Sequence, residues 1–241
     1  MYKIAIISGS ARNGRQTHKA ATCLASVFEK NEQVEKVDVL DVLSYNFPIM
    51  TAPFSAENDY PKGAKEFSDI LTAADAIVFA SPEYNGTMSG AFKNTVDYFY
   101  AEYKRKPIGI MTVAAGAFAG VNASHQLQSL VLSLGAFPMP YKMLVGNVYT
   151  AIDENNEPTN DRLKQSFQTF SNELLWLASA ISMKTRQSLQ QMAKLPPDIQ
   201  WRISRPPPFL GAAHPISGWR MAIAYMTPWA LNLRCYGSIQ R

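Results

Sequence analysis

The amino-acid sequence predicts a doubly wound α/β domain built on a five-stranded parallel sheet. Short apolar runs alternate with amphipathic segments of ten or more residues, a pattern typical of parallel strands joined by helical crossovers. The apolar runs are hydrophobic at nearly every position, as expected for strands whose two faces are both covered by helices. The alternation ends near residue 182, and these observations together predict one α/β domain followed by an extension.

The expected strands are short, β-branched or apolar runs bounded by glycine or polar residues. They cover residues 2–8, 34–42, 75–80, 108–114 and 145–149. The expected helices have apolar side chains recurring on one helix face, and they cover residues 15–30, 61–74, 90–100, 120–134 and 160–181. Ligands of such sheets bind beyond the carboxyl ends of the strands. The loops after the first, third and fourth strands are therefore the candidate binding loops.

The chain divides into a domain of residues 1–182 and an extension of residues 183–241. Up to Met183 there are 15 Lys and Arg against 18 Asp and Glu, a net charge of −3, whereas the remainder has 8 against one, a net charge of +7. The extension is proline-rich, and its run RPPPF at 205–209 favours extended backbone. We expect it to be irregular rather than an independent domain. Three interpretations of the extension are open. It is a mobile appendage, it packs around the domain or a partner subunit, or it is a non-native addition.

The composition also argues against several classes of protein. No apolar run reaches the roughly 20 residues of a spanning helix, and the start lacks a signal-peptide pattern, so a cytoplasmic protein without membrane contact is expected. The charge of the main domain gives no reason to expect nucleic acid as a partner. Cys23 and Cys235 are far apart and are interpreted as a buried thiol and a tail thiol. The three histidines are scattered, so no metal site is expected.

The loop after the first strand, residues 9–17 with the sequence GSARNGRQT, opens a helix. Free N–H groups and the positive end of the helix dipole make such a loop a natural phosphate site. Ser10 and Thr17 offer hydroxyl groups, and Arg12 offers a positive charge. The loop is not a Walker motif, because Arg15 replaces the lysine, and it lacks the second glycine of the dinucleotide fingerprint. It is a phosphate loop of another kind, or a plain turn with surface arginines.

Two further loops are candidates for holding a planar group. Residues 81–90, SPEYNGTMSG, form a rigid, sharply turned segment in which Tyr84 could cover a ring, or else an ordinary loop rich in turn residues. The small residues of 115–120 let the backbone approach a flat ligand closely, or else serve only helix packing. Asp41, at the end of the second strand, is interpreted as a solvated strand end.

The combination of G-S-x-R after the first strand, PEYN-G-x-x-S-G-x-x-K-N-x-x-D after the third and a Gly/Ala-rich loop after the fourth resembles the NAD(P)H-dependent FMN reductase family. Within this family, whose fold is flavodoxin-like, the chain looks like the azobenzene reductases and related quinone or chromate reductases. The resemblance runs over about residues 1–182. It implies that the protein binds FMN and takes electrons from NADPH or NADH.

The resemblance also implies which residues bind FMN. The phosphate would lie on Ser10, Arg12, Gln16 and Thr17. The isoalloxazine ring and ribityl chain would lie along Pro82, Glu83, Tyr84, Asn85 and Gly86. Ala115 and Gly116 would flank the ring. The chain departs from the family at Arg15, where many members have a serine, and Thr17 would then supply the hydroxyl group.

The resemblance implies an enzyme, an oxidoreductase that reduces azo compounds, quinones, free flavin or chromate-like acceptors by ping-pong hydride transfer through FMN. No side chain is expected to be catalytic, because the flavin itself carries the chemistry. Two alternatives are a flavodoxin-like electron carrier and a redox-sensing protein that keeps only the fold. The family also implies a homodimer or homotetramer. The aromatic-rich segment 92–103 belongs either to that interface or to the core.

Overall fold

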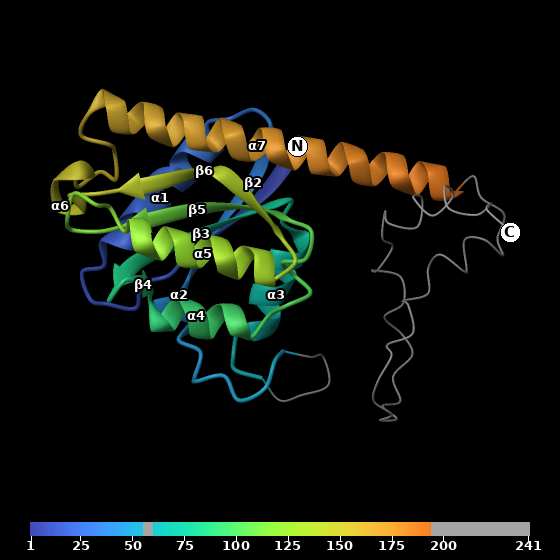
Figure 1. Cartoon of the computed structure of the whole chain (residues 1–241), viewed down its shortest axis with the longest axis horizontal. Helices are drawn as coiled ribbons and strands as arrows, with labels where there is room; N and C mark the ends of the chain where they lie inside the picture. The colour runs from blue at the N-terminus through green and yellow to red at the C-terminus, as the bar shows by residue number, and fades with distance from the viewer. Residues whose placement is uncertain (55–59, 194–241) are drawn as a thin grey trace, which may run out of the picture. The chain divides into compact units, whose positions relative to one another are not determined.

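The structure, a computed structural model, describes residues 1–54 and 60–193. At its centre five strands run parallel in the order β2-β1-β3-β5-β6 (Figure 1). The strands are β1 (Tyr2–Ser8), β2 (Val34–Asp41), β3 (Ala76–Tyr84), β5 (Pro107–Val113) and β6 (Phe137–Val145). This is the strand order of the flavodoxin-like doubly wound fold, so the predicted fold class is confirmed.

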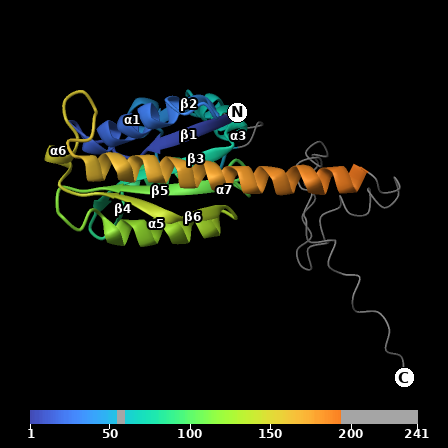
Figure 2. The same cartoon turned by 90° about the horizontal axis from the view of Figure 1, so that it is seen from above.

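Helices cover both faces of the sheet (Figures 1 and 2). One face is covered by α1 (Gln16–Glu29) and by the N-terminal part of α7 (Asp161–Ala193), which bury Leu24, Phe28, Phe167 and Phe170. The other face is covered by α3 (Ala64–Ala73), α4 (Gly90–Asp97) and α5 (Val121–Ser133). The inner strands β1, β3 and β5 are buried on both sides along most of their length, which explains their nearly uninterrupted apolar sequences.

Three short elements follow the carboxyl ends of the strands and were not predicted. They are α2 (Val42–Tyr45) after β2, β4 (Thr87–Met88) after β3 and α6 (Val148–Ala151) after β6. β3 itself continues past the predicted end at residue 80 and pairs with β4 in an antiparallel hairpin. Asn85 and Gly86 form the turn with φ of 51° and 80°. This matches the preference of Asn-Gly for hairpin turns that need two positive φ angles.

The predicted fifth strand at residues 145–149 is wrong. The strand lies upstream, in β6, and residues 148–151 form the helix α6. β6 contains Pro138 and Pro140, which cannot donate backbone hydrogen bonds and are tolerated because β6 is an edge strand paired only with β5. Its register also shifts opposite the interval between Ile108 and Ile110. The prolines and the irregular register hide the strand in the sequence.

Two other predictions change with the structure. The last helix does not end at residue 181 but runs to Ala193, so residues 183–193 of the extension are helical and not irregular. The rest of the extension lies outside the described residues. In the aromatic-rich segment, Phe92, Tyr98, Phe99 and Tyr103 are buried in the core, which is the packing interpretation.

Gly9, directly after β1, makes a close backbone contact with β3. Its N–H donates to the Ala80 carbonyl at 2.8 Å, and its carbonyl accepts a hydrogen bond from the Ser89 hydroxyl. A Cβ on Gly9 would lie 2.6 Å from Cδ2 of Phe92 and 2.7 Å from the Ala80 carbonyl oxygen. Since the Ser89 hydroxyl also caps α4, this contact joins the loop after β1 to the segment between β3 and α4.

We expect Gly9→Ala to lower the free energy of unfolding by about 2 kcal/mol or more, because the methyl group overpacks against backbone as well as side-chain atoms. Gly90→Ala is the matched control: a Cβ there meets nothing within 4 Å, and the residue lies in the first turn of α4. The control should be neutral or slightly stabilising. Urea denaturation measures both, and equal stabilities of the two variants would contradict the packing argument.

Candidate functional site

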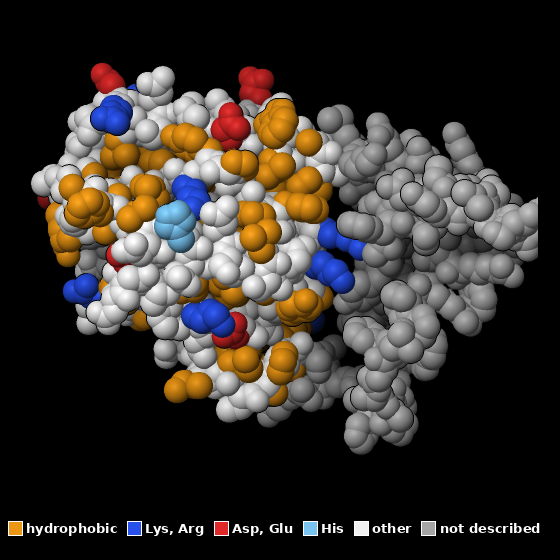
Figure 3. Space-filling model, in the orientation of Figure 1, with side chains coloured by type: hydrophobic (Ala, Val, Ile, Leu, Met, Phe, Trp, Pro, Cys, Tyr) orange, Lys and Arg blue, Asp and Glu red, His pale blue; other side chains and the backbone are white. Residues whose placement is uncertain are grey.

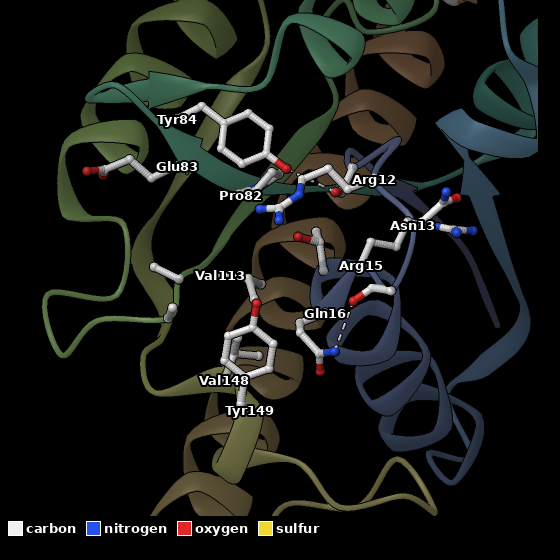
Figure 4. A pocket seen from close by; sticks show the side chains of 15 residues that line it. Arg12, Asn13, Arg15, Gln16, Pro82, Glu83, Tyr84, Val113, Val148 and Tyr149 are labelled. Atoms are coloured by element: carbon white, nitrogen blue, oxygen red, sulfur yellow. Dashed lines mark hydrogen bonds between the residues drawn. The ribbon is translucent and has the colours of Figure 1, made fainter.

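A cleft opens at the carboxyl ends of β1, β3 and β5 (Figure 4). The loop after β1, the end of β3 and the end of β5 form its walls, as predicted for a doubly wound sheet. Val148 and Tyr149 of α6, after β6, add a further wall. The three loops that the sequence singled out are therefore brought together, and a fourth segment joins them.

Most of the predicted cofactor-binding residues line this cleft: Ser10, Arg12, Gln16, Thr17, Pro82, Glu83, Tyr84 and Ala115. Asn85, Gly86 and Gly116 are not among its lining residues. The cleft also includes residues that were not predicted: Asn13, Gly14, Arg15, Val113, Ala114, Val148 and Tyr149. For Asn13, Gly14 and Arg15 the signal was available, because they belong to the predicted phosphate loop.

The N-terminus of α1 opens into the cleft without a side-chain cap. Its N-cap residue, Arg15, has extended backbone and makes no capping hydrogen bond, and the first turn contains no acidic residue. The first N–H groups of a helix lack partners within the helix, and the dipole there favours an anion. Ser10 and Thr17, each 2% exposed, lie at the same end. This is the donor set of a phosphate site.

Arg12 is the exposed cation of this end of the cleft, and no carboxylate pairs with it within the described part of the chain. Its Cζ lies 6.0 Å from the centroid of the Tyr84 ring, and the Tyr84 hydroxyl lies 3.4 Å from Oγ of Ser10 (Figure 4). The two contacts place a cation and an aromatic ring side by side above the loop. Arg12 therefore remains available for an anionic ligand.

Asp41 is not a solvated strand end, as predicted, but a buried carboxylate with 6% exposure. Nη2 of Arg15 donates to its Oδ2, and the same carboxylate caps α2 through the N–H of Leu43 at 3.2 Å and the Ser44 hydroxyl at 2.8 Å. Nδ1 of His18 lies 3.9 Å from Oδ1 of Asp41. Asp41 thus holds the Arg15 guanidinium at the end of β2.

The prediction for Asp41 failed because burial at this position depends on the sheet order. β1 and β2 are neighbours, and Ser8 pairs with Asp41 in their register. The loop after β1 therefore passes directly over the end of β2, where Arg15 reaches the carboxylate. The sequence shows an acid after a strand, but not which loop covers it.

Glu83 lies at the cleft with its carboxylate directed to α5 instead. Its Oε2 accepts a hydrogen bond from the N–H of Ala123 at 2.9 Å, and its Oε1 lies 3.4 Å from Nδ2 of Asn122. The N-cap of α5 is Gly120, which has no side chain, so the Glu83 carboxylate takes the place of a capping group. In Figure 4 its side chain points away from Arg12 and Gln16. Glu83 therefore lines the cleft with its backbone and not with its carboxylate.

Cys23 on α1 is a buried thiol, as predicted, and burial raises its pKa to about 12, so it stays protonated. Cys235 lies outside the described residues. Across residues 1–54 and 60–193, no group of three or more His, Cys, Asp or Glu side chains is arranged to hold a metal ion. In the same part of the chain, no helix has the length and apolar character needed to cross a membrane.

The fold and the cleft define a class, a doubly wound α/β protein with a cleft at the uncapped N-terminus of its first helix. The sequence profile described as NADPH-dependent FMN reductase matches residues 2–150, and the chain belongs to this family. The predicted resemblance and the predicted class, an FMN-dependent NAD(P)H oxidoreductase, are confirmed. The two alternative functions, a flavodoxin-like electron carrier and a redox-sensing protein, are not favoured by this family assignment.

Named relatives agree with this assignment. A quinone reductase of Pseudomonas putida is 30% identical over 178 residues, which cover 70% of this chain and 91% of the relative. An FMN-dependent NADPH-azoreductase of Staphylococcus haemolyticus is 29% identical over 155 residues, 62% of this chain and 80% of the relative. The structure of FerB, a flavoenzyme NAD(P)H:(acceptor) oxidoreductase of Paracoccus denitrificans, is similar in fold, with a TM-score of 0.59 at 21% identity over 74% of this chain and 98% of that one.

We expect Asp41→Ala to lower the free energy of unfolding by about 3–5 kcal/mol, because it leaves the partly buried Arg15 guanidinium unpaired. It also removes the cap of α2. The matched control is Asp69→Ala, which removes the exposed Lys65–Asp69 pair on α3 and should change stability by about 1 kcal/mol or less. Urea denaturation gives both values. An effect of Asp41→Ala no larger than that of the control would show that the buried pair does not fix the loop.

Proposed function

We propose that this FMN-dependent NAD(P)H oxidoreductase holds the FMN phosphate at the N-terminus of α1 and the isoalloxazine ring along the ends of β3 and β5. The uncapped helix N-terminus next to Arg12 carries this assignment. FMN has one terminal phosphate, so one such site suffices. The cleft offers N–H groups, two buried hydroxyl groups and one available cation for it.

The residues that would bind the phosphate are Ser10, Arg12, Gln16 and Thr17. Thr17 lies in the first turn of α1, where it would supply the hydroxyl group that many family members take from a serine at the position of Arg15. Arg15 does not replace that serine functionally, because Asp41 holds its guanidinium. Pro82, Glu83 and Ala115 would contact the ring through their backbones, and Tyr84 through its side chain. Asn85, Gly86 and Gly116 remain predictions from the family pattern.

We propose small oxidants as acceptors, with quinones and azo compounds first, because relatives carry those names. FMN, when bound, supplies the two-electron chemistry between NADPH or NADH and the acceptor. The chain would fix the phosphate and leave one side of the ring accessible to donor and acceptor in turn. No side chain of the cleft needs to act as an acid or a base.

The purified protein should be yellow, release FMN on denaturation, and oxidise NADPH or NADH in the presence of a quinone or azo dye. The apoprotein should lose this activity and regain it with FMN. NAD(P)H oxidation without any partner reductase separates the enzyme from an electron carrier. Protein that cannot be reconstituted with FMN would overturn the proposed site.

We further propose that the protein is a homodimer or homotetramer. Its molar mass, measured by light scattering, tests this proposal. Support comes from exposed apolar side chains on α5 and on the edge strand β6: Leu132, Phe137, Tyr141 and Leu144. Figure 3 shows hydrophobic side chains in several separate groups on the face viewed in Figure 1. We also propose that the protein works in the cytoplasm, where reduced nicotinamide cofactors are available.

We expect Arg12→Ala to weaken FMN binding about ten- to a hundredfold, because a charge-assisted hydrogen bond to phosphate contributes about 1.5–3 kcal/mol. Arg162→Ala, which removes an exposed arginine of α7 outside the cleft, is the control and should bind FMN like the wild type. Titration of the apoprotein with FMN, followed by flavin fluorescence, gives both affinities. Unchanged affinity in Arg12→Ala would place the phosphate elsewhere.

We propose that the extension after α7 is dispensable for flavin binding and reduction. Among the residues that the structure describes, those that line the cleft lie between Ser10 and Tyr149, and the family profile ends at residue 150. A chain ending at Ala193 keeps α7 whole. It should bind FMN and oxidise NAD(P)H at rates within about twofold of the full chain. Loss of FMN binding in this truncated protein would make the extension part of the working structure.

A further inference from the structure

Tyr149 is an aromatic side chain of the cleft that the family pattern did not point to. It lies on α6, on the side of the cleft opposite Tyr84, and its hydroxyl points into the cleft between Val113 and Gln16 (Figure 4). Its residue is 65% exposed, and within the described residues its hydroxyl has no hydrogen-bond partner. An aromatic ring left in water at the wall of a binding cleft lacks the packing partner that such rings usually have.

The backbone on both sides of Tyr149 is held firmly. The N–H of Val148 donates to the Ala114 carbonyl at 3.2 Å, and the N–H of Asn147 to the Gly116 carbonyl at 3.4 Å. On the other side, the hydroxyl of Thr159 donates to the carbonyl of Thr150 at 2.8 Å. Val148 is 3% exposed and anchors α6 in the core. The exposure of Tyr149 therefore does not come from a loosely attached turn.

Tyr149 lies between the two ends of the cleft. Gln16 marks the phosphate end, at the start of α1, and Val113 marks the end of β5, below the loop that flanks the proposed ring site. A side chain that reaches between them lies beside whatever connects these two ends. In FMN that part is the ribityl chain and the adjoining edge of the ring.

We propose that Tyr149 is a flavin-binding residue whose ring packs over the ribityl chain and the adjoining edge of the isoalloxazine, on the side of the cleft opposite Tyr84. This inference rests on the proposed FMN site. The ring buries apolar area against the flavin and slows its dissociation. The contact does not involve the phosphate, so Tyr149 contributes equally to the binding of FMN and of riboflavin, which lacks the phosphate.

The experiment compares the Kd of FMN and of riboflavin for the full-length apoprotein and four variants, by titration of flavin fluorescence. Tyr149→Ala removes the ring, and Tyr149→Phe keeps the ring without the hydroxyl. Tyr100→Ala removes another exposed tyrosine, 58% exposed and outside the cleft, and serves as control. Arg12→Ala serves as the phosphate-specific reference.

We expect Tyr149→Ala to weaken FMN and riboflavin binding by the same factor, about tenfold or more, and Tyr149→Phe to stay within about threefold of the wild type. Arg12→Ala should weaken only FMN binding, and Tyr100→Ala neither. Wild-type affinity of Tyr149→Ala for both flavins overturns the inference, as does a loss confined to FMN or an equal loss in Tyr149→Phe. In each of these cases FMN binding by the wild type leaves the proposed FMN site standing. A wild-type protein that binds neither flavin overturns that site itself.

Discussion

The close contact of Gly9 with β3 is the constraint on which the cleft depends. Ala80 accepts the N–H of Gly9, and Phe92 fills the space where a side chain would be. The start of the loop after β1 is therefore packed closely against the end of β3 and against α4. The same contact joins the start of this loop to the cap of α4 through Ser89, so the loop after β1 and the segment between β3 and α4 are held together at the cleft.

The ion pair of Arg15 and Asp41 fixes the other end of the same loop. A buried carboxylate needs a charged or hydrogen-bonding partner, and here it has the guanidinium, a backbone N–H and a hydroxyl. The pair has a second consequence, because it neutralises Arg15, one of the two arginines of the loop that line the cleft. Arg12 is left as the arginine of this loop that no carboxylate pairs with in the described part of the chain, and the uncapped N-terminus of α1 lies beside it. The proposed anion site would therefore suit a single phosphate group.

The sequence predicted the features that depend on local pattern. The strands β1, β2 and β5 and the helices α1, α3 and α5 were found within a few residues, because burial on one or both faces leaves a clear apolar period. The loop after β1 was singled out from its glycine and hydroxyl residues, and it does line the cleft. The environment of Asp41 could not be predicted, since it depends on which strand lies next to β2. Likewise the carboxylate of Glu83 is directed to α5, a contact between segments about 40 residues apart.

The wrong prediction for the edge strand β6 is the reason why α6 was not predicted as part of the cleft. Inner strands must be apolar on both faces, but an edge strand has a free side and accepts prolines, so β6 lacks the pattern that identified the others. Because the fifth strand was predicted at residues 145–149, Tyr149 was expected to be a strand residue. In the structure the sheet ends at Val145, and the chain turns back over the end of β5 through hydrogen bonds to Ala114 and Gly116. The end of the strand at Val145, together with these hydrogen bonds, is thus what places α6 and Tyr149 at the cleft.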